Sequence, residues 1–219
     1  NAAQDEAYSF DLYGNRLTKS LGSPVSQSWT STYDAAHQLT QVQQTVGGSA
    51  VTALLRYDDN GNLKKLCEAG SVGGTVSGTS TDCTASGAGS STTTLGWNGL
   101  EQLVALAKAG TTVLNEAYAY DHQGRRLAKV GAGGSGHSAT AYLYDGDAIL
   151  GEWSNALSGA PTAVYAHGGT DHPLLRLTGN SGGTDATVRY LAQDGLGSVT
   201  AYLSDNTAAN QTAVPGNVL

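Results

Sequence analysis

Acidic residues that directly follow an aromatic residue are the side chains of this 219-residue sequence with the clearest potential for chemistry. Carboxylates can act as general acids, as general bases or as metal ligands. They recur along the chain, with Asn at one position, at Asp11, Asp34, Asp58, Asn98, Asp121 and Asp145. The steps between these positions are 23, 24, 40, 23 and 24 residues. Because a fixed period of this size marks a repeated structural unit, the spacing indicates a repeat architecture rather than one reaction centre.

The residues after each acidic position indicate a tight turn. Asp at the first and Gly at the fourth position of a four-residue segment are typical of a type I turn. The carboxylate can accept hydrogen bonds from backbone amides of the turn, and Gly can adopt the positive φ with which the chain returns to a strand. Three segments have both residues: Asp11 with Gly14, Asp58 with Gly61, and Asp121 with Gly124. We therefore interpret the repeated aspartates as turn formers.

Three positions depart from that pattern. His37 occupies the place of Gly after Asp34, Asn98 replaces Asp, and the glycine after Asp145 has moved to position 146. We assign Asp34 and Asp145 as turn formers as well. At these three tips we expect turn geometries other than the one above.

Short alternating segments flank each expected turn. Tyr118 with Tyr120, and Tyr142 with Tyr144, place aromatic rings at period two and hence on one face of a strand. A second short strand follows the turn, so the repeat unit is strand, tight turn, strand and loop. Because one such hairpin cannot bury its apolar side chains alone, we predict an all-β fold in which antiparallel hairpins stack into a ribbon or β-solenoid.

One step of the period is 40 residues long instead of 23 or 24. A Gly-, Ser- and Thr-rich segment supplies the excess, and the only two cysteines, Cys67 and Cys83, enclose most of it. We expect an inserted loop closed by a disulfide, which would stabilise the fold by about 3 kcal/mol and indicate an oxidising compartment. Two reduced thiols remain the alternative, because two cysteines are a weak signal. Metal binding by this pair is not predicted, since no His or further Cys has suitable spacing.

Composition argues against several classes of function. The chain has 11 basic and 18 acidic residues and a net charge of −7, without a concentrated basic segment, so we expect no nucleic-acid partner. Its 30 Gly and four Pro fit many tight turns. No apolar run is long enough to span a membrane, and no signal peptide is evident. Because the sequence has no Met, we expect it to be a piece of a longer polypeptide.

Other motifs do not indicate a reaction. Segment 131–136 matches the dinucleotide pattern G-x-G-x-x-G, but it precedes a strand rather than a helix, which favours a loop. His167, Asp171 and His172 are suitable metal ligands, but without an evident fourth ligand we prefer a structural loop. No nucleophile elbow and no Ser/His/Asp triad can be assigned. We predict no catalytic residue, no cofactor and no metal.

Several segments resemble a known family. YSFDLYGNRLT, RYDDNGNLKKL and YAYDHQGRRLAKV are similar to the YD repeats of Rhs proteins, of the C components of insecticidal Tc toxins, of wall-associated proteins and of teneurins. The C-terminal third resembles the Rhs repeat-associated core domain through the segments GTDHPL and DGLGSV. Their matching residues are Asp171, Pro173, Asp194, Gly195, Gly197 and Ser198. The resemblance divides the chain into YD repeats at 1–140, with the Cys67–Cys83 insertion, and a core-like segment at 141–219 that continues the same ribbon.

The resemblance implies a structural function. In that family the β-ribbon spirals into a hollow shell that, in bacterial members, encloses a C-terminal toxin or effector. The expected partners are then the rest of the parent polypeptide, with further repeats and cargo, and the expected location is secreted or on the cell surface. Members that release cargo by autoproteolysis use an Asp-Pro motif, which this chain lacks, so no catalytic residue is carried over.

Two further functions stay open. Exposed aromatic rings on a broad sheet would suit an adhesion or glycan-binding module, and the exposure of Tyr118, Tyr142 and Trp153 would discriminate it. Alternatively, unpaired strand edges at the two ends of the ribbon could pair between copies and form a fibre.

Overall fold

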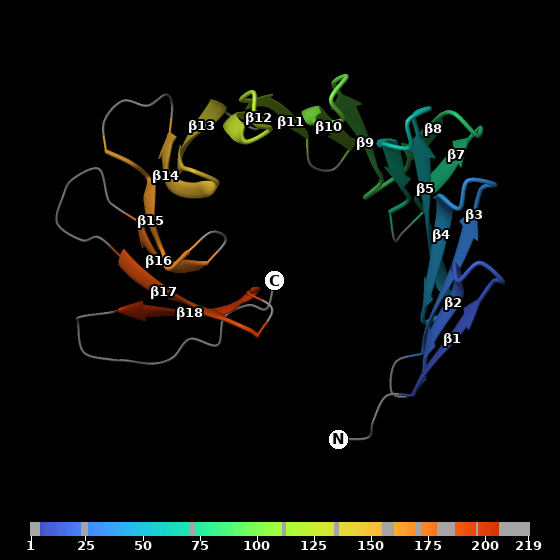
Figure 1. Ribbon diagram of the computed structural model, residues 1–219. Coiled ribbons are helices and arrows are strands. Elements are labelled where there is room, and N and C mark those ends of the chain that lie inside the picture. The colour runs from blue at the N-terminus through green and yellow to red at the C-terminus, as the bar shows by residue number, and fades with distance from the viewer. Residues whose placement is uncertain are drawn as a thin grey trace. The chain divides into compact units, whose positions relative to one another are not determined.

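The fold is built entirely from β-strands within the residues that the computed structural model describes (Figure 1). Those residues are 5–22, 26–70, 73–110, 113–133, 136–154, 160–169, 172–178, 187–195 and 197–205. Among them no helix has the length and apolar character needed to cross a membrane. The prediction of an all-β fold made from antiparallel hairpins is confirmed.

Sixteen strands form one antiparallel sheet in which each strand pairs with its neighbours in chain order, apart from one skipped hairpin. The strands of this sheet are β1 (Glu6–Phe10), β2 (Arg16–Leu21), β3 (Gln27–Tyr33), β4 (Leu39–Val46), β5 (Ser49–Tyr57), β6 (Leu63–Glu68), β9 (Ser91–Trp97), β10 (Leu103–Gly110), β11 (Leu114–Tyr120), β12 (Arg126–Gly133), β13 (Gly136–Asp145), β14 (Ala148–Ser154), β15 (Ala163–His167), β16 (Pro173–Thr178), β17 (Thr187–Gln193) and β18 (Val199–Asp205).

The skipped hairpin consists of β7 (Thr75–Gly78) and β8 (Cys83–Ser86), which pair only with each other as a separate two-stranded sheet. It lies between β6 and β9 in sequence, yet these two strands pair directly. The long step of the repeat therefore adds a hairpin without interrupting the main sheet.

The two faces of the sheet carry different side chains. Side chains of directly paired residues share a face, so the register places Tyr8, Lys19 and Trp29 of the first three strands in one row. On the opposite face the same strands present Ser9, Thr18 and Thr30. We call the first the aromatic face and the second the small-residue face. Large side chains cover one another on the aromatic face, and therefore alternate positions of β3 and β11 are partly buried there.

Very few side chains of the described residues are fully buried. The buried hydrophobic residues among the described ones are Leu54, Cys67, Ala69, Cys83 and Ala163. Leu54 and the two cysteines form one cluster, against which Val76 and Ala85 of the inserted hairpin pack. Most of the sheet has no packed core, so strand pairing and rows of surface side chains must hold it together.

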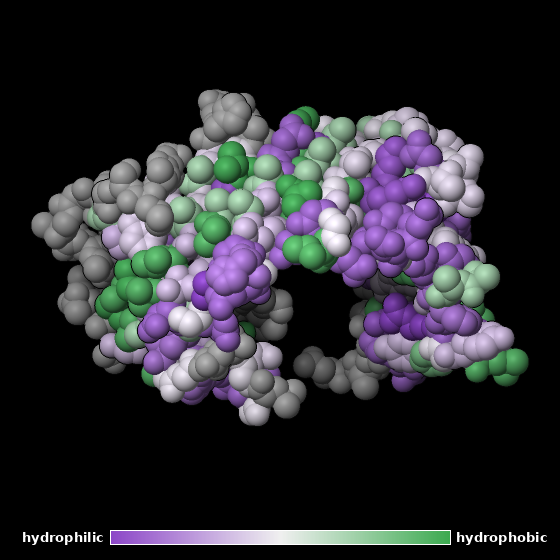
Figure 2. All heavy atoms as spheres, turned by 45° about the horizontal axis from the view of Figure 1, so that its top comes forward, coloured by the Kyte–Doolittle hydropathy of each residue, from purple (hydrophilic) through white to green (hydrophobic). Residues whose placement is uncertain are grey.

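The chain separates into two units, 1–117 and 118–219, with the division inside β11. The division that we inferred from sequence, after residue 140, lies inside β13. Hydrophilic residues cover most of the first unit in the view of Figure 2, and apolar residues gather in patches on the second.

Candidate functional site

The turn at Asp11 is the structural element that the sequence repeats. The backbone N–H of Asp11 donates to the carbonyl of Asn15 at 2.9 Å, and Gly14 N–H donates to the carbonyl of Asp11 at 3.2 Å. Oδ1 of Asp11 accepts hydrogen bonds from the amides of Tyr13 and Asn15, both at 2.9 Å. Gly14 has a φ of 87°, which completes a type I turn followed by a left-handed residue. The carboxylate is therefore occupied by its own turn.

The same backbone geometry recurs at five further tips. In each, the first residue donates to the carbonyl four positions on and accepts from the amide three positions on; these residues are Asp34, Asp58, Asn98, Asp121 and Asp194. Backbone amides also donate to the side-chain oxygen of the first residue. At Asn98, Oδ1 accepts from the amides of Leu100 at 2.9 Å and Gln102 at 3.0 Å. Gly61 and Gly124 take positive φ values of 89° and 84°.

The expectation of other turn geometries is wrong for the tips at Asp34 and Asn98. His37 and Glu101 occupy the glycine position there and adopt φ values of 61° and 60°. The turn requires a positive φ at this position, and His37 and Glu101 therefore adopt a left-handed backbone conformation that normally favours glycine. The tip at Asp145 does differ, because Asp145 pairs directly with Ala148 across a two-residue turn.

The residues assigned to the core-domain motif fall into two segments. Asp194, Gly195, Gly197 and Ser198 belong to a tip of the repeated kind, in which Gly197 has a φ of 85° and Ser198 N–H donates to Asp194 Oδ1 at 2.9 Å. This turn was not among those predicted from the sequence. Pro173 begins β16, whereas Asp171 lies outside the described residues.

Hydrogen bonds lower the pKa of three turn aspartates. The main cause is the Asn15 side chain for Asp11 and the Asn62 amide for Asp58. At Asp121 partial desolvation opposes the effect, but the hydrogen bond from Arg125 and the backbone amides prevail. All three carboxylates are thus held in the ionised form, which makes them unsuitable as general acids near neutral pH.

A second repeated element joins successive hairpins. At six tips the residue before the turn donates a hydrogen bond from its side chain to a backbone carbonyl just after the preceding turn. The pairs are Tyr33 to Arg16 at 3.1 Å, Tyr57 to Leu39 at 3.0 Å, Trp97 to Leu63 at 2.9 Å, Tyr144 to Arg126 at 2.8 Å, His167 to Ile149 at 2.7 Å and Gln193 to Pro173 at 3.1 Å. Burial raises the pKa of the Tyr57 and Tyr144 hydroxyls, so both remain protonated donors.

Basic side chains cover the rings of the aromatic face. Lys19 Nζ lies 5.6 Å from the ring centre of Tyr8 and 5.5 Å from that of Trp29. Arg126 stands 4.7 Å from the ring centre of Tyr118. Such cation–π contacts stabilise neighbouring strands of the ribbon. Tyr142 and Trp153 are half-buried, as is Tyr118.

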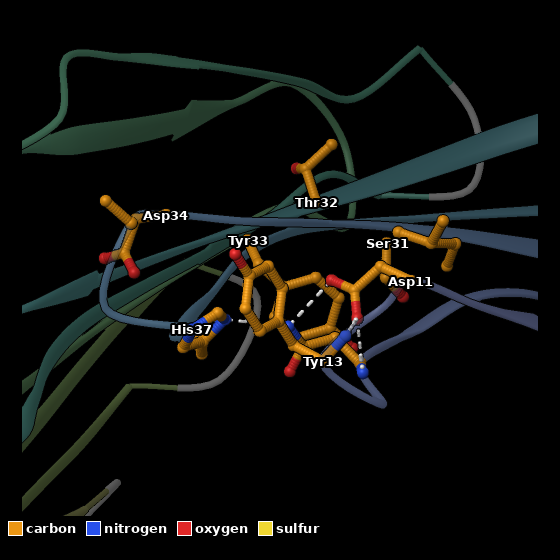
Figure 3. Close-up of a pocket in the computed structure, with 10 residues that line it drawn as sticks. Asp11, Tyr13, Ser31, Thr32, Tyr33, Asp34 and His37 are labelled. Atoms are coloured by element: carbon orange, nitrogen blue, oxygen red, sulfur yellow. Dashed lines mark hydrogen bonds between the residues drawn. The ribbon is translucent and has the colours of Figure 1, made fainter.

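A hollow of about 460 Å³ lies between the first two tips and is drawn in Figure 3. Tyr13 and His37 meet there with ring centres 4.5 Å apart, and Asn15 Nδ2 donates to His37 Nδ1 at 3.0 Å. Because Asp11 is engaged by its own turn, these contacts tie one tip to the next. The described residues contain no cluster of three or more acidic, His or Cys side chains that could hold a metal.

The disulfide between Cys67 and Cys83 anchors the inserted hairpin to the small-residue face. Its sulfur atoms are 2.07 Å apart, and both cysteines are almost completely buried. Lys65 Nζ and Asp82 Oδ1 lie 2.6 Å apart beside it, and this contact lowers the pKa of Asp82. Closing the insertion in this way fixes β7 and β8 above β5 and β6.

His167 has the structural role that tyrosine has in other repeats. Since the carbonyl of Ile149 can only accept, Nε2 of His167 carries the proton. The neighbouring tip is closed by a hydrogen bond of 2.9 Å from Gly168 N–H to the carbonyl of His172. The possible metal site at these histidines included Asp171, which the structure does not describe.

Comparisons with known proteins identify distant structural similarity only. No family model and no curated protein matches the chain. Crystal structures titled TcdB2-TccC3-TEV and TcdB2-TccC3-Cdc42 share 18% and 16% identity with it, each with a TM-score of 0.37 over 92% of this chain. A porin-like protein from Bacteroides uniformis ATCC 8492 shares 12% identity, with a TM-score of 0.34 over 91% of this chain and 86% of its own.

The chain spans 13% of the length of the two TcdB2-TccC3 chains. At such TM-scores these similarities carry no conclusion about function.

Proposed function

We propose that this chain is a non-catalytic structural segment of a larger Rhs/YD-type protein. The observation that carries the proposal is the side-chain hydrogen bond from the residue before a turn to the preceding hairpin. It repeats at six tips and uses Tyr, Trp, His or Gln for one purpose. Because its recurrent residues join one hairpin to the next, the chain is suited to forming an extended wall.

The proposed wall encloses a C-terminal toxin or effector of the parent polypeptide. Support comes from the resemblance of segments such as YAYDHQGRRLAKV to YD repeats and of DGLGSV to the Rhs core domain. We further propose a secreted or cell-surface location, because the Cys67–Cys83 disulfide suits an oxidising compartment.

Protease protection tests this function. The parent protein is digested with a nonspecific protease, and survival of its C-terminal region is compared with that of the same region produced alone. An enclosing wall predicts that the C-terminal region survives in the parent and is degraded alone. Equal degradation of the two would contradict encapsulation.

A glycan-binding module is less well supported. Its stacking platform would need free ring faces, but the guanidinium of Arg126 covers Tyr118, and Tyr142 and Trp153 are only partly exposed. The fibre hypothesis depends on the outer edges of β1 and β18, which each have one neighbour among the described strands. Strictly monomeric behaviour at high concentration would exclude it.

A further inference from the structure

The inserted hairpin and the sheet below it border a groove that the proposed wall does not require. The groove has a volume of about 460 Å³ and lies within the first unit. Gln41, Thr52 and Arg56 line it from β4 and β5, and Gly74–Gly78 line it from the hairpin. Its size is that of an ordinary ligand site, and its lining is mostly polar and neutral.

Arg56 is the one charged side chain in this lining, and only 7% of it is exposed. Its Nε donates to the carbonyl of Thr79, and Nη1 donates to the carbonyls of Thr40 at 3.0 Å and Leu55 at 2.7 Å. Within the described residues Nη2 has no acceptor and no carboxylate forms an ion pair with the guanidinium. Neutral carbonyls orient this buried cation without compensating its charge, so it is a suitable partner for an anion.

The groove also borders an open strand edge. β7 pairs with β8 on one side only. Thr79 N–H donates to the carbonyl of Asp82 at 2.8 Å, and antiparallel pairing then directs the backbone groups of Thr75 and Ser77 toward β8. By the same alternation Val76 and Gly78 direct their N–H and C=O groups away from β8. These groups are available to another extended backbone.

We propose that this groove binds an extended peptide segment with an acidic side chain, which adds to β7 as a third strand and places its carboxylate on Arg56. An extended backbone is the partner that satisfies alternate N–H and C=O groups of an edge strand. A carboxylate is the side chain that matches a buried guanidinium with free N–H donors. This binding activity is additional to the wall function and belongs to the disulfide-closed insertion.

Titration of the intact chain with two capped peptides, TVEVT and TVQVT, tests the proposal. We expect the Glu peptide to bind about tenfold more tightly than the Gln peptide, because only the Glu carboxylate can form a charge-assisted hydrogen bond of full strength with Arg56. Binding should slow hydrogen exchange at the amides of Val76 and Gly78. Arg56→Gln should abolish the preference for Glu. Lys64→Gln, a change of equal charge outside the groove lining, should retain it.

Equal affinity for the two peptides, or binding without protection of Val76 and Gly78, would overturn the proposal. Because Arg56 also holds Thr79, its replacement can loosen the hairpin, but the comparison of the two peptides on the unaltered chain does not depend on that variant. Glucuronic acid is a second probe. Glucuronic acid could displace the Glu peptide while the amides of Val76 and Gly78 stay protected. That result would reject strand addition in favour of a simple carboxylate site, because the protection would not depend on a bound peptide.

Discussion

The residue that precedes each turn and the residue that begins it have separate tasks. The Asp side chain organises its own turn, as Asp58 does by accepting from the amides of Asn60 and Asn62. The aromatic residue before it reaches back to the previous hairpin, as Tyr57 does to Leu39. The two tasks together explain why the pair of residues recurs.

Replacing Tyr57 by Phe tests the inter-repeat hydrogen bond. Only the hydroxyl is removed, so the carbonyl of Leu39 loses its side-chain donor in a partly buried place. We expect Tyr57→Phe to lower the free energy of unfolding by about 1 kcal/mol. The matched control is Tyr13→Phe, because the Tyr13 side chain is 77% exposed, and it should change stability very little. Urea denaturation provides the measurement.

The lowered pKa of Asp58 predicts loss of stability in acid. A folded-state pKa below the unfolded value of about 3.9 means that the carboxylate's contribution is fully present above that pH. It is lost as the pH falls through the lower folded value. In Asp58→Asn the fall of the melting temperature between pH 5 and about pH 2 should be smaller than in the original chain.

Asn98 supplies a natural precedent for that variant. Its Oδ1 accepts the same two amide hydrogen bonds as the aspartates do. Asp58→Asn should therefore be more stable at neutral pH than Asp58→Ala, which removes the acceptor. Equal stability of the two variants would contradict the role of the side chain in the turn.

At the scale of the element, the hairpin tip was the most predictable part of the fold. Asp at positions 11, 58 and 121, each with Gly three residues later, indicated the turn, because the hydrogen bonds of the turn form between residues close in sequence. The tips at Asp34 and Asn98 were misjudged, because tertiary pairing holds His37 and Glu101 at positive φ despite the conformational cost. The link from Tyr57 to Leu39 was not predictable, since it depends on strand register. The groove at Arg56 depends on where the insertion lies above the sheet.

Glu101→Gly should stabilise the protein. Glu101 has a φ of 60°, which costs a residue with a Cβ atom about 1 kcal/mol compared with glycine in the same conformation. After the greater chain entropy of glycine is considered, we expect a net gain of about 0.5 kcal/mol. Gly14→Ala is the converse change, because its added Cβ meets no atom within 4 Å, yet φ is 87°. Calorimetric melting should show opposite signs for the two variants.

For the whole molecule, stability must be distributed along the ribbon. Apart from contacts with the inserted hairpin, each described strand contacts only its neighbours in the sheet, and the cluster of buried hydrophobic side chains found among the described residues surrounds the disulfide. Repeat proteins of this kind behave as a sum of local units and neighbour contacts. A defect in one hairpin is therefore expected to affect nearby strands more than remote ones.

Replacing both cysteines by alanine tests that expectation. The variant Cys67→Ala/Cys83→Ala removes a closure of 16 residues and should lose about 3 kcal/mol of stability. Hydrogen exchange should accelerate in β5, β6, β7 and β8, whereas β16, β17 and β18 should keep their exchange rates. Uniform acceleration through all strands would show instead that the chain unfolds as one cooperative body.

The direct pairing of β6 with β9 has a consequence for engineering. Lys65 opposes Thr94 and Glu68 opposes Ser91 although a complete hairpin leaves the sheet between them. The pairing of β6 with β9 therefore does not use the hairpin strands as members of the sheet. This junction is a natural grafting position, where a foreign loop or small domain with closely spaced ends could replace the hairpin while the strands on either side keep their partners.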